Sequence, residues 1–373
     1  MQQSASHGKG QRVYQGSLRR IGALCTRKPL TFTAGGCTSL EEARWQDRVQ
    51  REDRHSAGIE YGRRAPDEVL GTLPERRRAI TVAKVAANAV MAGCKPEYFP
   101  VLLAATEAML EPAFNLIGPL SSQGSAAVLT IVNGPLAREL QINSRNNLFG
   151  PGHRANATIG RAIRLILMNA CASIPGLFDR SILGESAKYS YCIAENETET
   201  HWLPLHVERG FDREQSTVTV FACWSPRQLR CDADPRATLD CAADVASTFG
   251  TSLCTSDSVG DTSQLVRQGQ MVLTVAGAST FWRDWRKQDV RAYLHPRIGR
   301  SVADLKRVKV LSGAITPDDA QHRVLFVPEP DDILIVYAGG PEGTGYRCAV
   351  ILSELPKVAS AAVTKAITIP CIS

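Results

Sequence analysis

The sequence lacks the features that would place it in a membrane or in an oxidising compartment. It has no run of about 18 apolar residues that could span a bilayer, and its first 30 residues contain no apolar core of a secretory signal. Its 11 cysteines are odd in number and include no CxxC pair. We therefore expect a cytoplasmic protein with reduced thiols and no membrane partner.

The chain also lacks the common signatures of nucleotide, metal and nucleic-acid sites. No GxGxxG or Walker A loop is present, and no zinc-ligand spacing occurs. The net charge of +6 arises in residues 1 to 80, which carry 15 Lys+Arg and 9 Asp+Glu, so the remaining residues hold 28 of each sign. Because phosphate binding needs a basic surface, we expect no nucleic-acid partner for the body of the protein.

The order of apolar patterns predicts an α/β fold with a helical N-terminal entry, two α/β units and a disordered basic N-terminal tail. Residues 1–66 show no sustained period and are expected to be disordered or loosely attached. Residues 67–225 form the predicted first α/β domain and residues 226–373 the second. At 373 residues with 44% hydrophobic content, the chain is long enough for two cores.

Helix signals open the first domain. Residues 81–91 are apolar at helical spacing and stop at Gly93, and a second helix is expected from Pro96 to about residue 111. Cys94 falls between them, where backbone N–H groups and Lys95 would lower the pKa of its thiol. The same position also suits a small buried cysteine that serves packing alone.

Two further stretches predict strands and loops. Residues 126–132 are continuously apolar and end in Asn133, as in a buried strand that opens into a loop. The loop from residue 149 leads into a helix with Arg154, Asn156 and Arg161 in its first turns. These three side chains either bind an anion or serve as local caps and ion pairs.

The most polar stretch, residues 189–211, combines four acids, two histidines, a tryptophan and an arginine between predicted strands 188–194 and 216–224. Acid–base chemistry and a divalent metal are both predicted here. His206 and Glu208 would face the same side if their segment is extended. The candidate metal ligands are Glu195, His201, His206 and Glu208.

In the second domain, helices are expected at 235–250 and 278–294, and strands at 271–276, 324–327, 332–338 and 346–352. Gly277 and the glycine-rich loop after Gly339 follow strands, the positions at which open α/β sheets place ligands.

From residue 66 to 211 the chain resembles a family of bacterial and fungal proteins associated with the UGSC group, which is named for a selenocysteine or cysteine motif. The resemblance rests on six segments in one order: DEVLG at 67–71, NAVMAGCKPEYFP at 88–100, IVNGP at 131–135, RANATIGR at 154–161, YCIAEN at 191–196 and PLHVERGF at 204–211. It implies thiol or redox chemistry, or a partner subunit of a UGSC-type redox protein.

The favoured expectation is a thiol-dependent enzyme, a reductase or lyase, acting on a small anionic substrate. The alternatives are a metal-dependent hydrolase or lyase and a non-catalytic partner subunit. The expected protein partner is a second copy of the chain or a partner subunit. The expected catalytic residues are Cys94, Glu195, His206 and Glu208. The expected substrate-binding residues are Glu97, Tyr98, Asn133, Arg154, Asn156, Arg161 and Arg209.

Overall fold

The computed structural model describes residues 64–230, 234–251, 268–340 and 346–368. The disordered segment expected at 1–66 lies outside these ranges apart from Arg64 to Pro66. Arg64 already makes hydrogen bonds to Glu68 and Glu107. Within the described ranges, no helix is long and apolar enough to cross a membrane.

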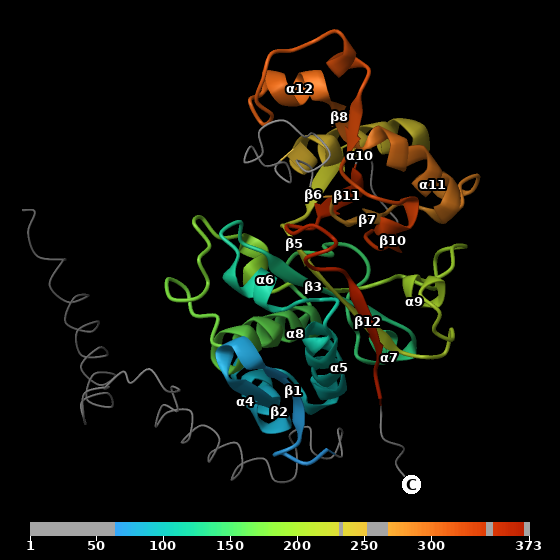
Figure 1. The fold of residues 1–373 in the computed structure, drawn as a ribbon. Coiled ribbons are helices and arrows are strands. Elements are labelled where there is room, and N and C mark those ends of the chain that lie inside the picture. The colour runs from blue at the N-terminus through green and yellow to red at the C-terminus, as the bar shows by residue number, and fades with distance from the viewer. Residues whose placement is uncertain (1–63, 231–233, 252–267, 341–345, 369–373) are drawn as a thin grey trace, which may run out of the picture. The chain divides into compact units, whose positions relative to one another are not determined.

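The α/β fold is confirmed, and it is built on two four-stranded sheets (Figure 1). The first has the order β12-β5-β3-β4 and the second the order β10-β7-β11-β6. The first sheet comprises β3 (Ala127–Asn133), β4 (Cys192–Ala194), β5 (Thr217–Cys223) and β12 (Val363–Ala366). The second comprises β6 (Arg227–Arg230), β7 (Met271–Val275), β10 (Ile333–Tyr337) and β11 (Tyr346–Leu352).

One edge strand of each sheet comes from the part of the chain that forms the other sheet. Strand β6 directly follows β5 but pairs with β11, whereas β12 follows β11 and pairs with β5. In each sheet one pair is parallel, β3 with β4 and β7 with β10, and the remaining pairs are antiparallel. The expected boundary at residue 225 lies between β5 and β6, and β12 lies beyond it in sequence but pairs with β5 of the first sheet.

The core follows from the alternation of strand side chains. In β3, Val128 and Val132 pack into a cluster with the first-domain helices, and Leu129 and Ile131 pack into another. That second cluster also contains Val336 of β10, so it lies between the two sheets. Consecutive residues of the central strands thus serve different cores, which explains why these strands are apolar throughout.

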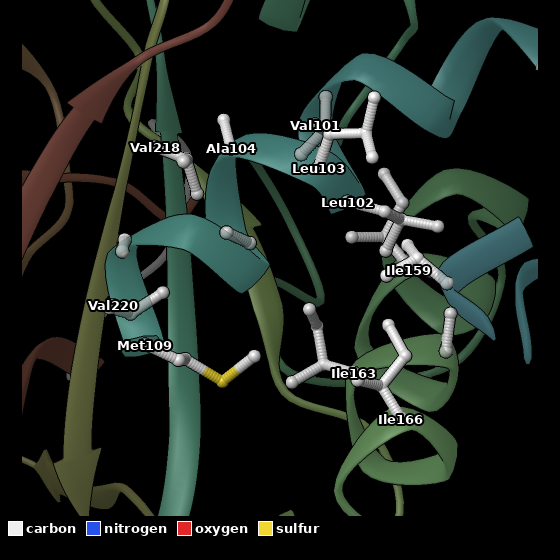
Figure 2. Close-up of a cluster of buried hydrophobic side chains, with 14 of the residues drawn as sticks. Val101, Leu102, Leu103, Ala104, Met109, Ile159, Ile163, Ile166, Val218 and Val220 are labelled. Carbon is white, nitrogen blue, oxygen red and sulfur yellow. The ribbon is translucent and has the colours of Figure 1, made fainter. Parts of the chain in front are cut away.

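Helices cover the outer face of each sheet. The first sheet is covered by α4 (Val82–Ala92), α5 (Phe99–Leu110) and α8 (Arg154–Leu165), and the second by α10 (Pro235–Gly250) and α11 (Lys287–Leu294). Figure 2 shows the apolar side chains of α5 and α8 facing one another beside Val218 and Val220 of β5. Helix α4 is capped at its start by Thr81, whose side chain accepts from the Lys84 N–H, and at its end by Gly93, with φ +81°, as its sequence predicts.

Shorter elements complete the chain. In the first half they are β1 (Val69–Leu73), β2 (Arg78–Thr81), α6 (Ile117–Ser121), α7 (Pro135–Glu139), a π-helical turn (Ile166–Ala170) and α9 (Leu205–Glu208). In the second half they are β8 (Gly299–Ser301), α12 (Val302–Arg307) and β9 (Arg323–Leu325). The helix expected at 278–294 is divided into a 3-10 turn, Ser279–Trp282, and α11.

Candidate active site at the ends of two parallel strands

A cavity of about 430 Å³ lies at the carboxyl ends of β3 and β4. These strands are parallel, so the residues that follow them, Gly134 and Glu195, meet at one edge of the sheet. The cavity is lined by Gly134, Arg138, Gln141, Ile142, Asn143, Ser144, Arg145, His153, Glu195, Asn196, Glu197 and Thr198. Part of the polar stretch 189–211 therefore does line a pocket.

Glu195 is buried beside this cavity, with a side chain that is 0% exposed. Its Oε2 accepts from the Asn133 side-chain amide and from the Leu205 N–H, each at 2.7 Å. Its Oε1 accepts from Lys287 Nζ and from the Tyr337 N–H, each at 3.4 Å. Both oxygens of Glu195 thus accept hydrogen bonds. Asn133 and Leu205 belong to the part of the chain before residue 226, and Lys287 and Tyr337 to the part after it, so Glu195 links the two parts.

Glu208 is neutralised on the other side of Lys287. Its Oε2 lies 3.0 Å from Lys287 Nζ, and both of its oxygens accept from the Arg291 guanidinium, at 2.9 and 3.1 Å. The extended segment expected here is wrong, because residues 205–208 form the short helix α9 after Pro204. His206 and Glu208 consequently meet different partners.

Glu197 is the carboxylate best placed for chemistry, although the sequence interpretation did not select it. Its Oε1 accepts from the Asn133 side-chain amide at 2.9 Å and from the Gly134 N–H at 2.7 Å. Among the described residues, the only cation near its Oε2 is Arg138, at 3.8 Å. The side chain is 7% exposed. One oxygen is thus fixed by two donors and the other is left without a hydrogen bond from the described part of the chain.

Gly134 makes this arrangement possible. Its φ is +87°, a conformation that favours glycine, and a Cβ here would lie 2.7 Å from the Gln215 carbonyl oxygen. The peptide can therefore direct its N–H at Glu197 only because residue 134 has no side chain. Two features of the sequence indicate this position for Glu197. Asn133-Gly134 follows a buried strand, and Glu195 and Glu197 alternate after another.

His206 is completely buried behind Glu197. Its Nε2 lies 3.3 Å from the Arg213 carbonyl oxygen, which can only accept, so Nε2 carries a proton. Its Nδ1 has no hydrogen-bond partner among the described atoms and lies 3.7 Å from Glu197 Oε1. His206 thus places an Nδ1 without a described hydrogen bond next to the Glu197 carboxylate.

Cys94 lies elsewhere, against the first-domain core. Burial raises the pKa of its thiol to about 11, although a hydrogen bond from Thr158 and the charge of Arg154 act in the opposite direction. The expected lowering of this pKa is wrong. The helix that follows Cys94 starts as a single 3-10 turn, and the desolvation of the thiol outweighs the local positive groups.

The remaining predicted binding residues occupy several places. Arg154 donates to the Gly93 carbonyl near Cys94, and Glu97 and Tyr98 lie beside that cysteine. The Asn156 side chain fixes the backbone of Asn143 through an accepted bond of 2.7 Å and a donated bond of 3.1 Å, so it shapes the cavity from behind. Arg161 and Arg209 line two other cavities.

The expected metal ligands do not converge. His201 is exposed and its Nε2 lies 3.3 Å from the Trp285 carbonyl, whereas His206 faces Glu197 and the two glutamates face Lys287. Over the ranges that the structure describes, no group of three or more His, Cys, Asp or Glu side chains could hold a metal ion. The proposed set of Glu195, His201, His206 and Glu208 therefore does not fit a divalent cation.

Comparison with family models, with curated proteins and with solved structures gives no significant match. The resemblance to the UGSC group rests on the sequence segments alone and stays a prediction.

Proposed function

We propose that the cavity beside Glu197 is the active site of an enzyme that transfers a proton to or from a small anionic substrate, in a reaction of the lyase type. The observation that carries the proposal is the asymmetry of Glu197, whose Oε1 is held by Asn133 and Gly134 while its Oε2 has no hydrogen bond from a described residue. A fixed carboxylate with one available oxygen has the geometry of a general base.

The charge around the cavity supports an anionic substrate. Arg138 and Arg145 both line it, and their side chains are 55% and 56% exposed. Long exposed guanidinium groups at the entrance attract an anion and can rearrange to hold it in a two-pronged contact. Arg145 is paired with Glu199, so Arg138 is the more available cation.

The proton would move from the substrate to Glu197 Oε2. Asn133 and Gly134 keep the carboxylate plane in position during this step, and the His206 ring lies behind it with Nδ1 3.7 Å from Oε1. Glu195 contributes indirectly, because it accepts from the same Asn133 amide and so orients it. Asn133, Gly134 and Glu195 are therefore positioning residues for Glu197.

The thiol-dependent reaction expected from the sequence gains no support from the raised pKa of Cys94. The role as a partner of a UGSC-type redox protein stays a prediction.

The test is hydrogen–deuterium exchange at the acidic C–H of small 2-oxo carboxylates in D₂O, followed by proton NMR with the full chain. We expect protein-dependent exchange of at least one such acid, and a fall of about 100-fold or more for Glu197→Gln. Glu139→Gln is the matched control, since Glu139 is exposed on α7 and outside the cavity. Cys94→Ala should retain the full rate. Unchanged exchange in Glu197→Gln would overturn the proposal, and loss in Cys94→Ala would favour the thiol.

A further inference from the structure

A second cavity, of about 650 Å³, lies between α9, α11, the start of β10 and β12. Its volume is in the range of small-molecule sites, about 300 to 1,000 Å³. It is lined by Leu205, Glu208, Arg209, Phe211, Arg291, Asp331, Leu334 and Thr364. None of these residues lines the cavity beside Glu197.

Most polar groups in this second cavity are already engaged. Glu208 and Arg291 pair with each other through two hydrogen bonds. The Thr364 hydroxyl lies 2.8 Å from the Thr219 hydroxyl. These groups offer little to a ligand, because any new contact would have to replace an existing one.

Two charges of opposite sign remain. Arg209 makes a single hydrogen bond among the described residues, from Nη2 to the Ala362 carbonyl at 3.0 Å. Asp331 makes no ion pair or side-chain hydrogen bond with any residue that the structure describes, and the two do not pair with each other. Both side chains are exposed. Burial of the guanidinium lowers the pKa of Arg209, and the Asp332 carboxylate acts in the opposite direction, so a further anion beside Arg209 would also stabilise its charge.

The rest of the wall is apolar. Leu205 and Leu334 are each 2% exposed, and Phe211 is half-buried beside them. A ligand that fits must therefore present an anion to Arg209, a cation to Asp331 and a hydrocarbon part to the leucines and Phe211.

We propose that this cavity binds a small apolar α-amino acid, with its carboxylate on Arg209, its ammonium on Asp331 and its side chain against Leu205, Phe211 and Leu334. A zwitterion satisfies both unpaired charges at once, whereas a simple anion would leave Asp331 unpaired and repelled.

The experiment is isothermal titration calorimetry of the full chain with three related probes. L-leucine carries both charges, 4-methylpentanoic acid lacks the ammonium, and 3-methylbutylamine lacks the carboxylate. We expect saturable binding of L-leucine and binding weaker by about tenfold or more for each single-charge analogue, because a charge-assisted hydrogen bond is lost.

Variants assign the two charges. Arg209→Gln should weaken binding of L-leucine and 4-methylpentanoate, whereas Asp331→Asn should weaken binding of L-leucine and the amine and strengthen binding of the acid, because the repulsion is removed. Arg213→Gln is the matched control, since Arg213 is an exposed arginine nearby in sequence and outside the cavity. Glu197→Gln should leave binding unchanged, so this site is tested apart from the proposed active site.

Three results would overturn the proposal. The first is the absence of saturable binding of L-leucine at millimolar concentration. The second is 4-methylpentanoate binding as tightly as L-leucine, and the third is L-leucine binding that Arg209→Gln does not change.

Discussion

The two sheets have the same internal plan and different chemistry at equivalent places. Each has a parallel pair followed by two antiparallel strands, and each parallel pair opens at its carboxyl end into a cavity. In the first sheet, Glu195 and Glu197 follow the strand ends. In the second, Ala338 and Gly339 follow β10, and the 480 Å³ cavity there has no Asp, Glu, His, Lys or Arg among its described lining residues. The backbone plan thus supplies a place for a site, and a few side chains decide whether chemistry can occur there.

The two halves are also joined by a buried ionic chain. Lys287 of α11, in the second half, lies between Glu195 and Glu208 of the first, and its side chain is only 4% exposed. This contact and the exchange of β6 and β12 make the halves interdependent. Three predictions test this comparison.

The largest expected effect comes from the ionic chain. We expect Lys287→Met to lower the free energy of unfolding by about 3 to 5 kcal/mol, because the buried carboxylate of Glu195 loses the only cation that pairs with it in the described part of the chain. Urea denaturation followed by circular dichroism measures it. Arg286→Met is the matched control on the adjacent residue, whose ion pair with Asp289 is exposed and should matter little. Equal losses in both variants would show that the ionic chain does not join the halves.

The second prediction tests whether the chemistry of the first half lies in its carboxylates or in Cys94. The pKa of Cys94 is raised from 9.0 to about 11, so below pH 9 its thiolate fraction is about 100-fold smaller than that of an unperturbed thiol. Iodoacetamide labelling of Cys94, followed by mass spectrometry, should therefore be slow at pH 7 and rise through pH 9 without levelling until about pH 11. A rate that levels off near pH 7 would restore the thiolate hypothesis.

The smallest effects come from one buried threonine in each central strand. Thr130 of β3 has a hydroxyl without a hydrogen-bond partner among the described atoms, whereas the Thr274 hydroxyl of β7 donates to the Ala349 carbonyl at 3.5 Å. We expect Thr130→Val to raise the free energy of unfolding by about 1 kcal/mol and Thr274→Val to leave it unchanged or slightly lower. Urea denaturation compares the two, and a loss of stability in Thr130→Val would contradict the reasoning.

Local patterns predicted most elements correctly. The apolar run before Asn133 predicts β3, the cap residues predict the ends of α4, and the pattern of residues 235–250 predicts α10. Each depends on neighbours within a few positions, where periodicity and capping act. The polar stretch 189–211 was also recognised as unusual, since four acids among strand residues have no packing role of their own.

The environment of the carboxylates in the candidate site depends on residues that are distant in the sequence. Glu195 and Glu208 pair with Lys287, and Glu208 also pairs with Arg291. Glu197 accepts from Asn133 and Gly134, which lie more than 60 positions before it in the sequence. Cys94 was misjudged because desolvation depends on everything that packs around a thiol and not on the residues next to it in sequence.

The amino-acid sequence therefore determined the α/β class, the two central strands and the loop that would be polar, because these follow from short-range periodicity and turn chemistry. The tertiary structure decided that β6 and β12 exchange sheets, which carboxylates are neutralised and which one is left available. Those outcomes depend on pairings between residues far apart along the chain, and burial makes each pairing energetically decisive.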